Sequence, residues 1–310
     1  MSELSIIQLD PAKAYQLPYA PAVDVPAGSE YVFLSGATGI PLYHAHPHIA
    51  EECVLPDDIA EQTRRVMANV MGVLESLGLG WGNVIHTYEF VTDLRDADEI
   101  HAAMGGFLGD ETWTPAATLI GVNSLSAPGA RLELDVIAVR PPASPTEADG
   151  TAPVSLPALG GVSPAVSVRT SENLLWMSGA TAIPLYHHHP HIEAECVVPD
   201  DAREQTRRIL ATFDEVLAFC GVGWGDVVKM TQFATDFRDK AAIDETVEAH
   251  LGGLPVRPPV MAVDIAGLSG PGAWLEIEVI ARRPSDGGAT PAPAVITQVH
   301  TEPERKALLP

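Results

Sequence analysis

Residues 35–65 read SGATGIPLYHAHPHIAEECVLPDDIAEQTRR, and residues 178–208 read SGATAIPLYHHHPHIEAECVVPDDAREQTRR. The two stretches are identical at 24 of 31 positions, without a gap, at an offset of 143 residues. The same offset pairs Trp81 with Trp224 and Glu133 with Glu276. A fixed period of this kind indicates one structural unit used twice. A unit of about 120 residues is long enough to bury a core of its own.

The charge and the cysteine content exclude several classes of protein. The net charge of -23 argues against binding to nucleic acid, because phosphates repel an acidic surface. Three cysteines in 310 residues are too few for a disulfide scaffold. The segment MSELSIIQLDPAK has neither the basic nor the apolar stretch of a signal peptide, and no apolar run is long enough to span a bilayer. We therefore expect a cytoplasmic protein that binds neither nucleic acid nor membranes.

Hydrophobic spacing within the first repeat predicts strands that alternate with helices. Asp57 or Asp58 is expected to cap a helix, since acidic residues favour a helix start, and Gly78 to end it. The predicted elements are strands at residues 31–34, 83–92, 118–122 and 131–139 and helices at residues 59–77 and 97–108. This order predicts an α+β fold in which one mixed sheet is backed by two helices.

The repeat also predicts the domain boundaries. We expect a first domain over residues 1–140, a linker over 141–155, a second domain over 156–283, and a Pro-rich tail over 284–310 without regular structure. The last strand of each domain alternates acidic with apolar residues, so one face of the sheet is apolar and should lie under the helices. The acidic face is expected either to meet water or to pack in an oligomer with sites between subunits.

Several motifs, in the same order in both repeats, resemble the Rid (YjgF) family. They are the Ser-Gly turn after the first strand, the helix start Pro-x-Asp-x-x-x-Gln-Thr, FVTDLRD at residues 90–96 and PGARLELDVIAV at residues 128–139. The second repeat has FATDFRD and PGAWLEIEVIAR. The resemblance implies a chorismate-mutase-like α+β fold, trimers with ligand pockets between neighbouring domains, and hydrolysis of enamines and imines to ketones and ammonia. With two domains per chain, a homotrimer would mimic a hexamer, and a dimer is the alternative.

The resemblance also assigns roles to residues at matching positions. Active members carry an arginine in a Pro-x-Arg-Ser/Thr motif, where the guanidinium binds the substrate carboxylate. That position holds Ala117 in the first repeat and Val260 in the second. The glutamate that orients water in the family matches Glu133 and Glu276, and an asparagine of the second helix matches His101. The missing arginine predicts a substrate without an α-carboxylate.

Two loops hold most of the histidines, at His44, His46 and His48 in the first repeat and at His187, His188, His189 and His191 in the second. Such side chains can hydrogen-bond locally, line a pocket and move protons near neutral pH, or bind a transition metal. Pro47 and Pro190 are expected to bend the loops, and the spacing matches no established metal-binding pattern. We therefore expect no metal site and no cofactor.

The preferred function is hydrolysis of a small imine, enamine or related carbonyl compound, in which Glu133 activates water and a histidine protonates the leaving group. A non-catalytic ligand-binding or regulatory protein and a metal-dependent enzyme that uses the histidine loops remain as alternatives. The candidate catalytic residues are Glu133, His101 and Glu276. Arg131 is either a displaced cation for the substrate or an ion-pair partner of nearby acidic residues. The candidate substrate-binding residues are Tyr19, Ser35, Gly36, Tyr43, His44, His46, Ala117, Thr118, Arg131, Ser178, Gly179, Tyr186, His187 and His189.

Overall fold

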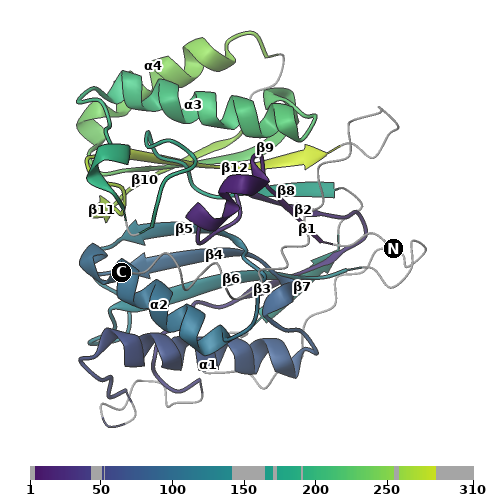
Figure 1. The fold of residues 1–310 in the computed structure, drawn as a ribbon, viewed down its shortest axis with the longest axis vertical. Coiled ribbons are helices and arrows are strands. Elements are labelled where there is room, and N and C mark those ends of the chain that lie inside the picture. Colours follow the sequence, from purple (N-terminus) through teal and green to yellow (C-terminus); the bar gives the residue numbers. More distant parts are fainter. Residues whose placement is uncertain are drawn as a thin grey trace.

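The computed structural model describes residues 4–42, 51, 53–141, 165–169, 173–189, 191–254 and 258–283. The chain forms four layers, with two helices outside each of two facing sheets (Figure 1). The helices are α1 (Ile59–Ser76), α2 (Ala97–Leu108), α3 (Ala202–Phe219) and α4 (Lys240–Leu251). None of the helices in these ranges is long and apolar enough to cross a membrane.

The main helix of each repeat begins and ends at the residues expected from the sequence. Asp58 caps α1 by accepting a hydrogen bond from the Glu61 N–H, and Asp201 does the same for α3. Gly78 follows α1 with a φ of 69°, in the left-handed region that glycine adopts without strain. The predicted α+β fold is therefore confirmed in both repeats.

Each sheet contains six strands. The first-repeat sheet has the order β11-β5-β4-β6-β3-β7, and the second-repeat sheet has the order β1-β2-β8-β12-β9-β10. Their bounds are β1 Ser5–Ile7, β2 Ala22–Val25, β3 Glu30–Leu34, β4 Val84–Val91, β5 Ala116–Gly121, β6 Leu132–Arg140, β7 Ala165–Arg169, β8 Asn173–Met177, β9 Val227–Ala234, β10 Val260–Asp264, β11 Gly267–Leu268 and β12 Leu275–Arg283. The residue pattern did not predict β1, β2, β7 and β11.

Two strands are exchanged between the repeats. Strand β2 pairs antiparallel with β8 of the second repeat, and β7, which occupies the place of β2 in the repeat, pairs with β3 of the first. A tight turn, in which the Ser29 N–H donates to the Pro26 carbonyl at 3.3 Å, carries the chain from β2 in one sheet to β3 in the other. Because β3 and β8 are equivalent strands, either offers β2 a suitable edge. The exchange links the two repeats through backbone hydrogen bonds.

The face of each sheet that is turned away from the helices packs against the other sheet. Ile85, Ile137, Trp176 and Ile280 form a separate apolar cluster between the two sheets. Glu276 is 5% exposed in this interface. The acidic face of the second repeat therefore packs against the first repeat of the same chain, whereas the sequence led us to expect water or a contact between subunits.

The contact between the repeats is not reciprocal. Strand β11 of the second repeat pairs with β5 of the first, with Gly267 opposite Gly121. Strand β10, which corresponds to β5, instead forms the outer edge of its sheet, and its Val260 and Met261 are 47% and 48% exposed. Glu133, which corresponds to Glu276, is only half-buried. Each repeat therefore uses one face for the contact within the chain. The equivalent surfaces, at β10 and at Glu133, are not covered by the described residues.

Candidate functional site

A cavity of about 190 Å³ lies between the two repeats. Its lining includes eight residues selected from the sequence, namely Tyr19, His101 and Ala117 from the first repeat and Ser178, Gly179, His187, His189 and Glu276 from the second. Glu89, Arg95 and His191 also line the cavity. The cavity therefore brings Glu276 of the second repeat together with Tyr19, His101 and Ala117 of the first.

The Ser-Gly turn after β8 forms one wall of this cavity. The Ser178 hydroxyl donates to the Ala20 carbonyl at 2.6 Å and accepts from the Ala117 N–H at 2.9 Å. The Gly179 N–H lies 3.2 Å from the Ala117 carbonyl. These bonds hold the second-repeat turn against β5 of the first repeat, so the motif positions the wall of the pocket through its backbone and its hydroxyl group.

Glu276 is a buried carboxyl group that lines the cavity. Burial, reinforced by the neighbouring charge of Glu278, raises the pKa of the Glu276 carboxyl to about 8. At neutral pH this group is therefore predominantly protonated and can donate a proton to a ligand.

Glu278 lies two residues further along the same strand, and its carboxylate is held by the first repeat. The Tyr88 hydroxyl donates to Glu278 at 2.7 Å, and the Thr118 hydroxyl donates to it at 3.2 Å. Burial also raises the pKa of Glu278. Thr118, selected from the sequence as a substrate-binding residue, thus contacts the glutamate behind the cavity and does not belong to the lining.

His101 projects from α2 into the cavity and forms a dyad with Glu89 of β4. The His101 Nε2 atom lies 2.8 Å from a carboxylate oxygen of Glu89. Burial lowers the pKa of His101, but the charge and hydrogen bond of Glu89 outweigh burial, so the pKa of His101 is raised. A carboxylate that orients an imidazole is the arrangement used for general acid–base catalysis.

Among the described residues, the wall at Ala117 contains no free guanidinium group. Arg95 is the arginine among the lining residues, and its Nε atom lies 2.9 Å and 3.1 Å from the two carboxylate oxygens of Asp93. Tyr19 lines the same cavity with its ring 5.8 Å from that of His189, and burial raises the pKa of its hydroxyl group. The cavity therefore presents neutral and apolar groups where the resemblance predicts a carboxylate-binding arginine in active members.

Three histidines of the second loop point into the cavity together. The ring centres of His187, His189 and His191 lie 4.5 Å, 4.6 Å and 5.1 Å apart. His188 points elsewhere, and its Nδ1 atom lies 2.8 Å from the Glu195 carboxylate. The three histidines that point into the cavity are thus alternate residues of the loop.

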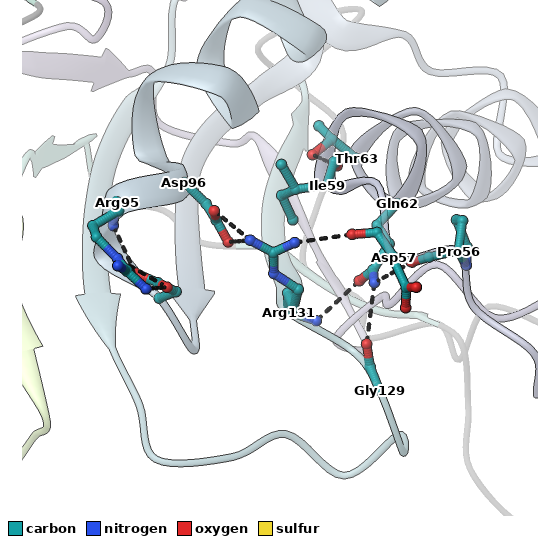
Figure 2. A network of polar contacts seen from close by, with 10 residues as sticks. Pro56, Asp57, Ile59, Gln62, Thr63, Arg95, Asp96, Gly129 and Arg131 are labelled. Carbon is teal, nitrogen blue, oxygen red and sulfur yellow. Dashed lines mark hydrogen bonds and ion pairs between the residues drawn. The ribbon is translucent and has the colours of Figure 1, made fainter.

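Arg131 lies in a separate polar network at the start of α1 (Figure 2). Its guanidinium forms an ion pair with Asp96 and donates to the Asp57 carbonyl at 2.9 Å. The Arg131 N–H donates to the Gln62 side chain, which in turn donates to the Pro56 and Gly129 carbonyls. Of the two interpretations of Arg131, this placement favours the ion-pair partner.

The remaining candidates that the structure describes lie away from the cavity. Glu133 lies against Gly36 on the first-repeat sheet, and neither residue nor Ser35 is among the lining residues. The Tyr186 hydroxyl accepts a hydrogen bond from the Asp10 N–H at 2.8 Å, outside the lining. Tyr43, His44 and His46 lie outside the described residues.

The sequence did not select Glu89, His191 or Glu278 for this site. Alternation along the strand VIHTYEFV places Glu89 on one face of β4, which was a usable signal, and His191 belonged to a loop already noted. The resemblance implied pockets between neighbouring domains, but which residues of the two repeats meet in this cavity had no local signal, because it depends on how the sheets face one another.

Two tandem α+β domains, each with a Ser-Gly turn beside the glutamate of its last strand, define the class of protein to which this chain belongs. The sequence model of the Endoribonuclease L-PSP family matches residues 12–140 and residues 154–283. The chain is a member of this family, also called Rid or YjgF, with two copies of its domain.

Individual relatives match one repeat at a time. Protein DfrA of Myxococcus xanthus is 34% identical over 122 residues, which are 39% of this chain and 85% of that protein. The 2-iminobutanoate/2-iminopropanoate deaminase of Escherichia coli K12 is 33% identical over 87 residues, which are 28% of this chain and 67% of that protein. A crystal structure of E. coli TdcF with bound serine is 28% identical, with a TM-score of 0.31, and the match covers 44% of this chain and 98% of that one.

Proposed function

We propose that this protein hydrolyses the C=N bond of a small imine, of the imine tautomer of an enamine, or of a related carbonyl derivative, in the cavity between its repeats. The observation that carries the proposal is the pairing of a neutral Glu276 carboxyl group with the His101–Glu89 dyad in one lining. An imine deaminase from E. coli is among the relatives of the chain. Family membership and the acid–base pair therefore support the same type of reaction.

The two groups have complementary roles in this proposal. Glu276, protonated at neutral pH, donates a proton to the imine nitrogen and makes the carbon electrophilic. His101, held by Glu89, takes a proton from water as the oxygen attacks that carbon. These roles differ from the sequence interpretation, in which Glu133 activates water and a histidine is the acid.

The tetrahedral intermediate then collapses with the roles reversed. The His101 imidazolium returns its proton to the nitrogen, the C–N bond breaks, and the Glu276 carboxylate takes the hydroxyl proton as the carbonyl forms. Overall, one imine and one water give one ketone or aldehyde and one ammonia. Both side chains end the cycle in their starting protonation states.

The substrate proposed here lacks an α-carboxylate. The described lining contains Ala117 at the position of the family arginine, and Arg95 is bound to Asp93. An anionic ligand would enter beside a buried carboxyl group without a cationic partner, which is costly. A neutral or aromatic imine avoids this cost.

Ammonia release from neutral imines generated in the assay tests the proposal. We expect Glu276→Gln and His101→Ala each to lower kcat by about 10²- to 10⁴-fold, the range for loss of a general acid or base. Glu133→Gln is the matched control, because it changes the equivalent glutamate outside this cavity and should retain most of the rate. If Glu133→Gln removes activity while Glu276→Gln retains it, the assignment of the site is wrong.

A non-catalytic binding or regulatory protein is the second candidate, favoured by the absence of the arginine at Ala117. Saturable binding of neutral imine analogues without ammonia release from any imine tested would support it over the hydrolase. A homotrimeric assembly and a cytoplasmic location belong to both versions of the proposal. The exposed edge strand β10 and the half-buried Glu133 leave faces for contacts between chains.

A further inference from the structure

The three histidines that share one side of the second loop bring their nitrogens close together. One ligand atom from each of His187, His189 and His191 lies within 4.8 Å of the others. In a tetrahedral zinc site with Zn–N distances of about 2.0–2.1 Å, the nitrogens lie roughly 3.4 Å apart. Small side-chain rotations therefore suffice to bring the three atoms to metal-binding distances.

The hydrogen bond that His187 makes with the backbone suits metal binding. His187 is 6% exposed, and its Nδ1 atom lies 2.8 Å from the Pro184 carbonyl, to which it can only donate. The Nε2 atom of His187 therefore carries the lone pair. A histidine that ligates a metal commonly donates its second N–H to a backbone carbonyl, which fixes the tautomer and the ring orientation.

His189 supplies an independent sign that a ligand belongs at this place. Its Nε2 atom is buried and has no hydrogen-bond partner among the described residues. A buried polar atom without a partner is destabilising, because it has lost its hydrogen bonds to water and gained none in the protein.

Comparison of the two repeats distinguishes these three histidines from His188. At the offset of 143 residues, His187, His189 and His191 correspond to His44, His46 and His48, whereas His188 corresponds to Ala45. Both copies thus carry the three residues that converge in the second loop. The residue that points away to Glu195 is a histidine in one copy only.

We propose that His187, His189 and His191 bind a divalent transition-metal ion of the zinc type, with its open coordination position facing the cavity between the repeats. This reverses the expectation of no metal, which rested on the spacing and on the prolines of the loops. The proposed role of the ion rests on the proposed hydrolysis, but its binding does not.

In that role, the ion binds the attacking water and lowers its pKa. His101 takes the proton, the resulting hydroxide forms the new C–O bond, and the Glu276 carboxyl group protonates the nitrogen as the π electrons move to it. Ammonia then leaves as the carbonyl group forms, so that one imine and one water again give one ketone or aldehyde and one ammonia. Three protein ligands with one open position are the usual arrangement of a catalytic zinc site.

Metal content and cobalt spectra of the full chain, produced without a polyhistidine tag, test the inference. Every variant carries His46→Ala, so that the first loop does not contribute. After dialysis against Zn²⁺ and removal of free metal, we expect one more equivalent of zinc in His46→Ala than in His46→Ala/His189→Ala. Replacement by Co²⁺ should give the intense visible bands of a four-coordinate ion, also missing from the double variant.

His188→Ala is the matched control, because it removes a histidine of the same loop that points away from the cluster. It should bind zinc like its parent, whereas His191→Ala should weaken binding by more than the roughly 10- to 100-fold typical of losing a hydrogen-bond partner of a metal ligand. Circular dichroism checks that each variant folds. Equal zinc content with and without His189 and His191, or equal loss in His188→Ala, would overturn the inference.

The metal readouts separate this inference from the proposed function. Zinc bound through the three histidines without ammonia release supports the site and contradicts the hydrolase. Ammonia release that depends on Glu276 from protein without zinc supports the hydrolase and contradicts the catalytic role of the ion, while failure of His46→Ala to hold more zinc than His46→Ala/His189→Ala contradicts the site.

Discussion

The Glu276 carboxyl group lies where a side chain on residue 179 would have to be: a Cβ added to Gly179 would lie 1.8 Å from the Glu276 Oε1 atom. The same relationship recurs in the first repeat, where a Cβ on Gly36 would lie 2.2 Å from Glu133 Oε1. The glycine of the Ser-Gly motif therefore allows the glutamate of the last strand to rest on the backbone of the turn.

Gly179→Ala should displace Glu276 and disrupt the cavity. The new methyl group would also lie 3.0 Å from the Thr118 hydroxyl, so little room remains on the opposite side. We expect a loss of stability of about 1–3 kcal/mol, typical of overpacking, and a large fall in kcat. Gly225→Ala is the control, because nothing lies within 4 Å of its added Cβ. Equal activities of the two variants, measured by ammonia release, would contradict this role of Gly179.

Glu276→Gln should make the stability of the protein depend less on pH. The folded pKa of about 8 lies above the ordinary value of 4.5, so the folded state holds a proton that the unfolded state releases between these values. The stabilisation is therefore fully present below pH 4.5 and is lost as the pH rises through about 8.

Chemical denaturation at several pH values in this window measures the effect. The free energy of unfolding should fall with rising pH in the native protein and more weakly in Glu276→Gln. In the control Glu61→Gln the pH dependence of the unfolding free energy should remain. Hydrogen bonds from Arg64 and Arg65 lower the pKa of Glu61, so this carboxyl group titrates below the pH range of the measurement. Identical slopes in all three proteins would show that Glu276 is not protonated in the folded state.

The same shift predicts the alkaline limb of the rate profile. As a general acid, Glu276 must be protonated, so kcat for a neutral imine should decline as the pH rises through about 8. Steady-state kinetics with a substrate that does not itself titrate there would detect the decline. A rate that keeps rising above this pH would rule out Glu276 as the acid.

Ala117→Arg should raise activity on imines that carry an α-carboxylate, such as 2-aminoacrylate. Ala117 lines the cavity, and a guanidinium placed there can bind a carboxylate through two hydrogen bonds. Since a missing buried partner costs about 3–5 kcal/mol, the gain can reach roughly a hundred- to a thousandfold. Arg95→Ala tests the other cation of the lining and should not change the low native rate. A native rate equal to that of an arginine-bearing relative would refute the prediction.

Arg131→Ala should reduce stability without changing catalysis. It removes the ion pair with Asp96 and the hydrogen bond to the Asp57 carbonyl, outside the cavity. Hydrogen bonds to charged groups are worth about 1.5–3 kcal/mol, so the melting temperature should fall by several degrees. Arg64→Ala, which breaks only the exposed pair with Glu61, should cost less. Loss of activity in well-folded Arg131→Ala would restore the displaced-cation hypothesis.

Light scattering at micromolar concentration should give the mass of three chains of 32.9 kDa. The exposed Val260 and Met261 on the edge strand β10 provide apolar surface for a contact between chains. Met261→Lys should weaken the assembly, while Lys replacing the exposed Val54 on the first repeat should not. A monomeric or dimeric mass for the native protein would contradict the prediction.

The sequence by itself determined the repeat, the α+β class and the position of the main helices. These features depend on short-range patterns. Asp58 and Gly78 mark helix ends through local hydrogen bonds and backbone conformation, and the apolar residues of α1 recur at the helical period. The same local patterns recur in the second repeat at an offset of 143 residues, so the same elements are expected there.

Tertiary structure alone decided which residues share the cavity. The sequence offered Glu133, His101 and Glu276 as catalytic candidates and assigned the activation of water to Glu133, whereas packing of the two sheets places Glu276 in one cavity with His101 and leaves Glu133 at another face. The exchange of β2 and β7 is equally invisible locally, because equivalent strands offer equivalent edges. Whether β2 pairs with β3 or with β8 depends on how the whole chain folds, and the local sequence pattern of a strand carries no information about that choice.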